Sequence, residues 1–108
     1  MKRGDVVTAV LSGNYGKPRP VLVVQSDLYQ GHASLTVVPL TSTLLDAPLF
    51  RLPLYPSASN GLREVSQIMI DKVATIRRER SGGVIGEIDG DVMLAVSRAL
   101  AMWLGIAS

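Results

Sequence analysis

The sequence predicts an α+β domain in which a small, strongly curved antiparallel sheet or barrel carries one C-terminal helix. Short apolar runs rich in β-branched residues follow one another up to about residue 76, and turn-forming residues separate them. Only near the end of the chain does the apolar period change to that of a helix. A chain of 108 residues has room for one compact domain, residues 1–108.

The first two strands are predicted in the N-terminal quarter of the chain. Asp5 to Leu11 reads as a strand that ends at the turn formers Ser12 to Gly16. The loop is expected to continue through Pro18 and Pro20. Val21 to Gln25 is a continuous apolar run, which predicts a strand buried on both faces in the middle of the sheet.

Three further strands are predicted before the helix. Leu35 to Leu40 is the third, and Pro39 is expected at a sheet edge or near the end of this strand because it has no N–H. Leu49 to Leu54 is the fourth, followed by a surface loop over residues 55–61. The fifth is expected to run from Glu64 to about Ile76, with a bend.

The C-terminal helix is predicted to start at Asp89 or Asp91, either of which is a candidate N-cap. Its apolar residues recur at spacings of three and four: Met93, Val96, Leu100, Trp103 and Ala107. Gly105 is expected to end the helix or to fray it. Trp103 and Leu104 make the helix apolar on more than one side, which fits either core packing or contact with another subunit or partner.

The composition excludes several classes of function. The chain has no cysteine, so it has no disulfide, no thiolate nucleophile and no thiolate metal site. One histidine, His32, and nine scattered acidic residues argue against a two-histidine acid/base pair and a two-metal nuclease. We therefore expect no metal and no cofactor. A net charge of +2 is too small for a protein that coats nucleic acid by charge alone, so any such binding requires a local patch.

The sequence shows no targeting or membrane segment. The basic N-terminus has no apolar core of a signal peptide behind it. The most apolar segment, Val92 to Ala107, is interrupted by Ser97 and Arg98 and is shorter than the ~20 apolar residues of a membrane span. A cytoplasmic protein without membrane contact is expected.

Arg19 is the first candidate functional residue. It lies between Pro18 and Pro20, whose fixed φ angles stiffen the segment and favour a preorganised anion site. A guanidinium donates in a planar fork that matches a phosphate, and its permanent charge can stabilise charge that develops on phosphorus. The alternative interpretation is a solvated arginine in a loop.

Two other polar segments are candidates for the same chemistry. The successive hydroxyls of Thr41, Ser42 and Thr43 follow a strand and can bind phosphate or ribose oxygens, or they can satisfy the backbone of their own turn. Asp71 and Lys72 lie where the strand alternation breaks, and can accept a proton, contact a base edge, or form a surface ion pair.

Two basic features remain open. His32 can serve as a proton shuttle, but a lone loop histidine is more often solvated, so it is left out of the catalytic set. The run Arg77 to Arg80 can contact an RNA backbone or an acidic protein, with a solvated face as the default.

Several segments in register resemble the MazF/PemK family of toxins from type II toxin–antitoxin systems. The matching segments cover nearly the whole chain: Arg3 to Val7, Lys17 to Gln25, Val38 to Ser42, and Ser66 to Ile76. The resemblance implies an SH3-like barrel with a C-terminal helix, a homodimer, and a cognate antitoxin as partner. It also implies metal-independent cleavage of single-stranded messenger RNA, in which the ribose 2′-hydroxyl attacks the adjacent phosphorus and leaves a 2′,3′-cyclic phosphate.

The resemblance also assigns roles to residues of this chain. Arg19 and Thr41 match the catalytic arginine and hydroxyl of the family. Residues expected to bind RNA are Lys17, Ser42, Gln67, Asp71 and Lys72, and residues expected at a partner or dimer interface are Trp103 and Leu104. Some plasmid-encoded members have an arginine two residues before the aspartate that matches Asp71, as a proposed general acid. This chain has Met69 there, and a thioether cannot donate a proton.

Two alternatives remain beside the ribonuclease. The ending Met102 to Ile106 is also similar to CcdB, a poison of DNA gyrase, in which a Trp-Gly-Ile ending contacts the target. Here Leu104 separates Trp103 from Gly105, and CcdB lacks the segment Lys17 to Pro20. The other alternative is a non-catalytic module that binds an antitoxin or RNA, which only Met69 favours. The ribonuclease is the preferred hypothesis.

Overall fold

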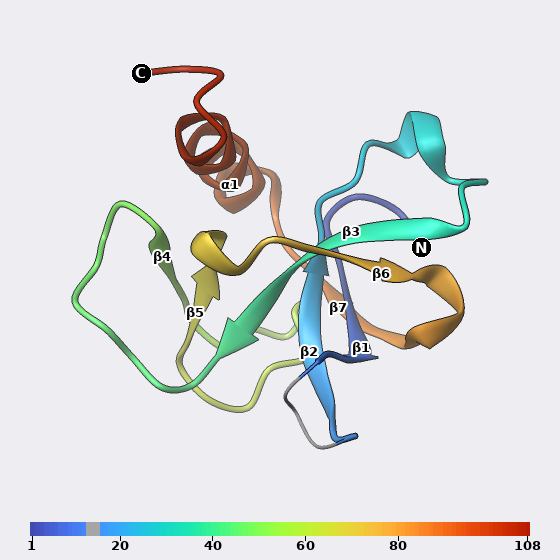
Figure 1. Cartoon of the computed structure of the whole chain (residues 1–108). Coiled ribbons are helices and arrows are strands. Elements are labelled where there is room, and N and C mark those ends of the chain that lie inside the picture. Colours follow the sequence, from blue (N-terminus) through green and yellow to red (C-terminus); the bar gives the residue numbers. More distant parts are fainter. Residues whose placement is uncertain (13–15) are drawn as a thin grey trace.

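The computed structural model describes residues 1–12 and 16–108, and shows one antiparallel sheet followed by a helix (Figure 1). The turn predicted over Ser12 to Gly16 falls largely on residues 13–15, which lie outside the described residues. The strands are β1 (Asp5–Val10), β2 (Pro18–Val23), β3 (Ser34–Thr41), β4 (Arg51–Leu54), β5 (Ser66–Met69), β6 (Ala74–Arg77) and β7 (Ser81–Glu87), and the helix is α1 (Gly90–Trp103). Three short 3-10 turns lie between them: η1 (Asp27–Tyr29), η2 (Ile70–Lys72) and η3 (Arg78–Arg80).

The sheet is strongly curved, but strand pairing does not close it. Its order is β4-β5-β3-β2-β1-β7, and β6 pairs with β3 beside this path. The loop after β4 connects the two ends instead, because Glu87 N donates to Ser59 O over 2.8 Å. Gly61 has φ +71°, and a Cβ there would lie 2.2 Å from the carbonyl oxygen of Ile85, so only glycine permits this close crossing. The predicted α+β class is confirmed, with an open curved sheet in place of a closed barrel.

Strand alternation places an apolar core on each face of the sheet. Leu22 points to the face that α1 covers, where it packs with Val38, Ile68 and Val96 among others. Val21 points to the opposite face, into a cluster with these other members: Val7, Ala9, Val23, Leu35 and Val37. The strand β2 lies between β1 and β3, so the prediction of a doubly buried strand in the middle of the sheet is confirmed.

The predicted fifth strand, Glu64 to Ile76, is in fact two strands separated by η2. The end of β3 pairs with β5, from Leu40 to Thr41, whereas its first half, Ser34 to Val37, pairs with β6. Pro39 lies between these two stretches, so neither β5 nor β6 needs an N–H from it. It is the third residue from the end of β3, as expected for a proline near the end of a strand. The turn η2 makes the step from β5 to β6, so the two strands meet different halves of β3.

Two further expectations are corrected. Pro18 and Pro20 belong to β2, in register with Val10 and Thr8 of β1, and not to the preceding loop. Their fixed φ angles suit extended backbone, and in this stretch β2 has a described strand partner on one side only. The strand β7 was not predicted, because its glycines hide the alternation of side chains. A Cβ on Gly82 would lie 2.2 Å from Thr8 Oγ1, so this strand depends on close backbone approach.

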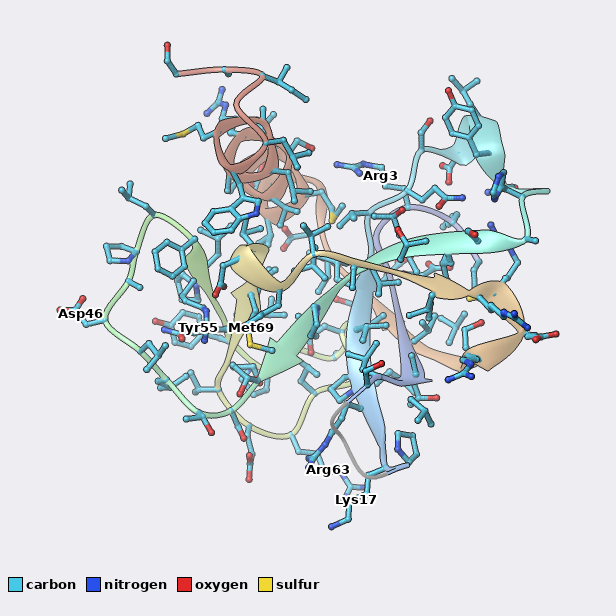
Figure 2. The ribbon with its side chains drawn as sticks, in the orientation of Figure 1. Arg3, Lys17, Asp46, Tyr55, Arg63 and Met69 are labelled. Atoms are coloured by element: carbon cyan, nitrogen blue, oxygen red, sulfur yellow. The ribbon has the colours of Figure 1, made fainter. Side chains whose placement is uncertain are left out.

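The helix α1 begins and ends as predicted. The Asp89 carboxylate caps it by accepting from Val92 N over 3.1 Å, and Gly105 follows its end with φ +75°. Arg3, labelled in Figure 2, joins the N-terminal segment to this helix by donating to Ser97 Oγ. Within the described ranges, no helix is long and apolar enough to cross a membrane.

Candidate active site

Arg19 and Thr41 lie on the same face of the sheet, on neighbouring strands. In the pairing of β2 with β3, Val21 lies opposite Pro39. The described pairing ends there, and alternation within each strand puts Arg19, two residues before Val21, and Thr41, two residues after Pro39, on the same face. The two residues that the sequence predicted as catalytic therefore lie on one face of neighbouring strands, although 22 positions separate them in the chain.

A row of side chains runs from Thr41 across two more strands. Thr41 pairs with Gln67 of β5, and Gln67 pairs with Pro53 of β4. The row therefore runs Thr41, Gln67, Pro53 across three strands, and Arg19 lies on the same face of the neighbouring strand β2. A strip of this kind, with a cation at one end and a hydroxyl beside it, can hold an extended polyanion across the sheet.

The backbone of Arg19 is held by strand pairing. The residue is exposed and pairs with Ala9 of β1, between Pro18 and Pro20. Its backbone thus belongs to a paired strand and not to a loop. An exposed guanidinium on such a strand is suited to bind phosphate oxygens in a bidentate manner.

The hydroxyl of Thr41 has a defined donor. Thr43 N donates to Thr41 Oγ1 over 3.0 Å, which fills one lone pair of the oxygen. A hydroxyl has one hydrogen and two lone pairs, so the O–H of Thr41 remains available for an acceptor outside the turn. The Thr41 hydroxyl can therefore still donate to a ligand such as a phosphate oxygen.

Gln67 contacts the chain that follows β3. Its Nε2 donates to Leu45 O over 2.8 Å, and its Oε1 accepts from Leu45 N over 2.9 Å. Each half of the amide thus makes one hydrogen bond within the protein, and one amide hydrogen is left over.

Asp71 forms an ion pair that sequence reasoning missed. Arg51 donates to both carboxylate oxygens, from Nε over 2.8 Å and from Nη2 over 3.0 Å, and the side chains are only 9% and 15% exposed. These hydrogen bonds hold the pKa of the Asp71 carboxyl below its ordinary value, although burial acts in the opposite direction. Asp71 therefore stays ionised and is a weak base.

One signal for this pair was present in the sequence. Arg51 is a charged residue inside a predicted apolar strand, and such a residue is seldom buried without a partner. The partner itself lies 20 residues away, on η2, and no local pattern identifies it.

Met69 lies on the same face as Gln67, two residues further along β5 from the row of Thr41 and Gln67. It pairs with Arg51 of β4, and continuing the register of β3 with β5 places it opposite Pro39. Figure 2 shows Met69 on β5, near the end of β3. The neighbouring row is thus largely apolar, with the Arg51–Asp71 pair at its far end.

The other predicted RNA contacts lie at the border of this face. Lys17 precedes β2 and Ser42 follows β3, so both are exposed at the same edge of the sheet, where Figure 2 shows Lys17 pointing outward. Lys72 is exposed on η2, next to Asp71. Within the described residues, no group of three or more His, Cys, Asp or Glu side chains is arranged to hold a metal ion.

His32 and the basic run lie at the opposite end of β3. His32 precedes this strand and Thr41 ends it, and eight strand residues span about 23 Å at roughly 3.3 Å per residue. His32 Nδ1 accepts from Ser34 N over 2.9 Å, and Arg78 Nε donates to His32 O over 2.8 Å. Arg78 of the basic run therefore holds the loop before β3 by a hydrogen bond, far from Thr41.

Trp103 and Leu104 lie at the end of α1 and are both half-exposed. The Trp103 ring also contacts Phe50, with centroids 6.0 Å apart and planes tilted by 49°. Trp103 thus packs on Phe50 with one side of its ring, while it and Leu104 remain half-exposed. Other exposed apolar residues of this region are Leu49, Met102 and Ile106.

Known proteins show the same fold and a similar sequence. The family model described as "PemK-like, MazF-like toxin of type II toxin-antitoxin system" matches residues 2–104. A protein of Mycolicibacterium smegmatis named probable endoribonuclease MazF is 46% identical over 108 residues, which cover 99% of each chain.

Two solved structures agree with this match. The Mycobacterium tuberculosis toxin MazF-mt6 superposes with a TM-score of 0.81 at 26% identity, covering 96% of this chain and 99% of that one. An endoribonuclease in complex with its cognate antitoxin, from mycobacterial species, gives a TM-score of 0.81 at 25% identity, covering 100% and 98%. The chain therefore belongs to the PemK-like, MazF-like toxins of type II toxin–antitoxin systems.

Proposed function

We propose that this endoribonuclease toxin cleaves single-stranded messenger RNA at short sequence motifs, without a metal ion. The placement of Arg19 and Thr41 on one face of adjacent strands carries the proposal. An RNA strand that crosses this face between Arg19 and Thr41 brings one phosphate to both a guanidinium and a hydroxyl donor. These are the groups needed to bind the phosphate and to stabilise added negative charge on it.

The proposed reaction is a transesterification within the RNA. The ribose 2′-oxygen forms a bond to the adjacent phosphorus, the bond to the 5′-oxygen breaks, and a 2′,3′-cyclic phosphate remains. The 2′-hydroxyl loses its proton, and the leaving 5′-oxygen gains one. Arg19 stabilises the charge on the phosphoryl oxygens in the transition state, and the Thr41 O–H donates to one of them.

We assign the two proton transfers to neither Asp71 nor Met69. The Arg51 guanidinium occupies the Asp71 carboxylate and lowers its pKa, which weakens it as a base. Met69 has no proton to donate. In this chain, catalysis therefore relies mainly on positioning and charge stabilisation by Arg19 and Thr41.

The remaining predicted residues are proposed to surround this centre. Lys17, Ser42 and Lys72 contact RNA phosphates or sugars from the border of the face, and the Asp71 carboxylate, held by Arg51, accepts a hydrogen bond from a base edge. Gln67 has one amide hydrogen left for an RNA acceptor. Neutralising phosphates in this way makes RNA affinity fall with increasing salt.

We further propose that the chain acts as a homodimer in the cytoplasm and that a cognate antitoxin inhibits it. The similar mycobacterial endoribonuclease was solved in complex with its antitoxin. The half-exposed Trp103 and Leu104, with the apolar residues around them, are the proposed contact for the second subunit or the antitoxin.

The test is to incubate the purified protein with a defined RNA in the presence of EDTA and to map the product ends. Cleavage at fixed positions that leaves 2′,3′-cyclic phosphate ends supports the proposal. Intact RNA contradicts it, and trapped complexes of gyrase with cleaved DNA in a parallel assay would instead identify a CcdB-like poison. Intact RNA together with tight antitoxin binding would identify a non-catalytic module.

A further inference from the structure

The Gln67 side chain holds the turn that follows Thr41. Hydrogen-bonded pairing between β3 and β5 comprises only two residue pairs, and it ends where Thr41 lies opposite Gln67. Beyond this point a side chain continues the attachment, because the Gln67 amide donates to Leu45 O over 2.8 Å and accepts from Leu45 N over 2.9 Å. Gln67 thus binds Leu45 as the next residue of a strand would.

This contact bears on the orientation of the Thr41 hydroxyl. The turn from Thr41 to Leu45 is held at one end by β3 and at the other by Gln67. Between them, Thr43 N donates to Thr41 Oγ1 over 3.0 Å and fills a lone pair on the side of the turn. The hydroxyl hydrogen must therefore point away from the turn. Releasing Leu45 frees the turn, and with it the constraint on the hydroxyl.

We propose that Gln67 is a positioning residue, which acts on the reaction through Thr41 by fixing this turn. The inference rests on the proposed function, in which the Thr41 O–H donates to the scissile phosphate. The role through Thr41 changes kcat, whereas the direct RNA contact proposed for the remaining amide hydrogen changes KM, so the effect on kcat tests the positioning role.

The experiment compares Gln67→Met, Thr41→Val and the double variant by single-site cleavage of a defined RNA. Methionine keeps the length of the side chain and removes both hydrogen bonds to Leu45. We expect Gln67→Met to lower kcat about tenfold or more, since small misplacements of a reacting group have effects of this size. In the Thr41→Val background, the same change should have no further effect, because the two residues act as a unit.

Gln25 provides a matched control. Its amide makes the same kind of contact with the backbone at the start of β3, through Nε2 to Ser34 O at 3.0 Å and Oε1 from Thr36 N at 2.9 Å. These contacts lie at the end of β3 opposite to Thr41. Gln25→Met should therefore leave kcat within about twofold of wild type, even if the variant is less stable.

Gln67→Glu gives a second readout that does not depend on stability alone. The ionised carboxylate still accepts from Leu45 N but faces Leu45 O with a second oxygen, whereas the protonated acid again donates to it. Its activity relative to wild type should rise as the pH falls through the range of a glutamic acid, around 4.3. Thermal unfolding of each variant, followed by circular dichroism, shows whether Gln67→Met is folded, and Gln67→Glu takes its place if it is not.

Three results would overturn the inference while wild-type cleavage stands. These are an unchanged kcat for a folded Gln67→Met, a loss that multiplies with that of Thr41→Val, and an equal loss in Gln25→Met. If Gln67→Met is not folded, the inference is overturned when the activity of Gln67→Glu relative to wild type does not rise at acid pH. A wild-type protein that leaves RNA intact contradicts the proposed function itself, so the two failures are distinguishable.

Discussion

Arg19 is held in a strand between two prolines and is exposed to solvent, so a change of its side chain should affect ligands more than stability. We expect Arg19→Ala to lower the RNA cleavage rate about 10²- to 10³-fold, as for loss of a transition-state donor. Arg19→Lys should recover part of the rate, because it restores the charge without the planar fork. Single-turnover cleavage of a defined RNA is the measurement.

His32→Ala is the control for Arg19, because His32 lies at the other end of β3. It should cleave at nearly the wild-type rate. A loss of less than about tenfold in Arg19→Ala would refute the role of Arg19 as a transition-state donor.

Thr41 tests whether the hydroxyl acts as a donor. We expect Thr41→Val, which keeps the shape and removes the O–H, to lower kcat about 10- to 100-fold, corresponding to one hydrogen bond of ~1.5–3 kcal/mol to a charged group. Thr41→Ser should stay within about fivefold of wild type, because it keeps the hydroxyl. Equal activity of the serine and valine variants would show that the hydroxyl makes no contact in the transition state.

At the scale of single residues, the sequence predicted the types of group but not all of their partners. Arg19 and Thr41 were identified because each belongs to a short motif with recognisable chemistry. The contacts of Gln67 with Leu45 and of Asp71 with Arg51 bridge 22 and 20 positions. Such contacts depend on strand pairing, which no local pattern encodes.

The elements β4 and η2 are joined by the Arg51–Asp71 pair, so its loss should affect stability. We expect Arg51→Ala or Asp71→Asn to lower the free energy of unfolding by about 3–5 kcal/mol, because each leaves a nearly buried group without its partner. Replacing both by apolar residues, as in Arg51→Met with Asp71→Leu, should cost much less. Urea unfolding at neutral pH measures these differences.

The same pair predicts a pH dependence with a definite sign. The pKa of Asp71 is lower in the folded than in the unfolded protein. Its contribution is therefore fully present above the ordinary aspartate pKa of about 3.9 and is lost as the pH falls through the lowered value. Wild type should thus lose stability relative to the doubly apolar variant as the pH falls. The exposed pair Arg77–Glu79 is the control, since its side chains are 77% and 75% exposed, and Glu79→Gln should change little.

At the scale of elements, the period of apolar residues predicted the helix and those strands that bury every second side chain. It did not predict β7, because Gly82, Gly83 and Gly86 have no side chains to alternate. It also joined β5 and β6 into one strand. The strands β5 and β6 pair with different halves of β3, and the turn η2 lies between them. The period of side chains along the sequence does not show where this step occurs.

In the molecule as a whole, the candidate site and the basic run lie at opposite ends of β3, while the exposed end of α1 forms a third surface. The sequence predicted a curved sheet with a helix, but not how its ends are joined. The loop after β4 crosses β7 at Gly61 and Gly86, where backbone meets backbone. Contacts of this kind are set by the three-dimensional path and leave only isolated glycines in the sequence.

The exposed end of α1 should decide assembly. Leu104 is 59% exposed beside Trp103, and an apolar side chain at the centre of an interface is sensitive to charge. We expect Leu104→Glu to raise the dissociation constant of the homodimer or of the antitoxin complex by at least about tenfold, since burial of an unpaired carboxylate is costly. Light scattering and calorimetric titration measure the two constants.

Leu28→Glu serves as the matched control for this surface. Leu28 is 87% exposed on η1, close to the basic run, so a charge there should leave both constants unchanged. Trp103 also packs against Phe50, so its replacement would affect the fold as well as assembly. Leu104 lacks this contact, so the effect of Leu104→Glu on assembly can be measured in a folded variant. If Leu104→Glu assembles as wild type does with both partners, the contact lies on another surface, and the exposed end of α1 is an ordinary part of the solvated exterior.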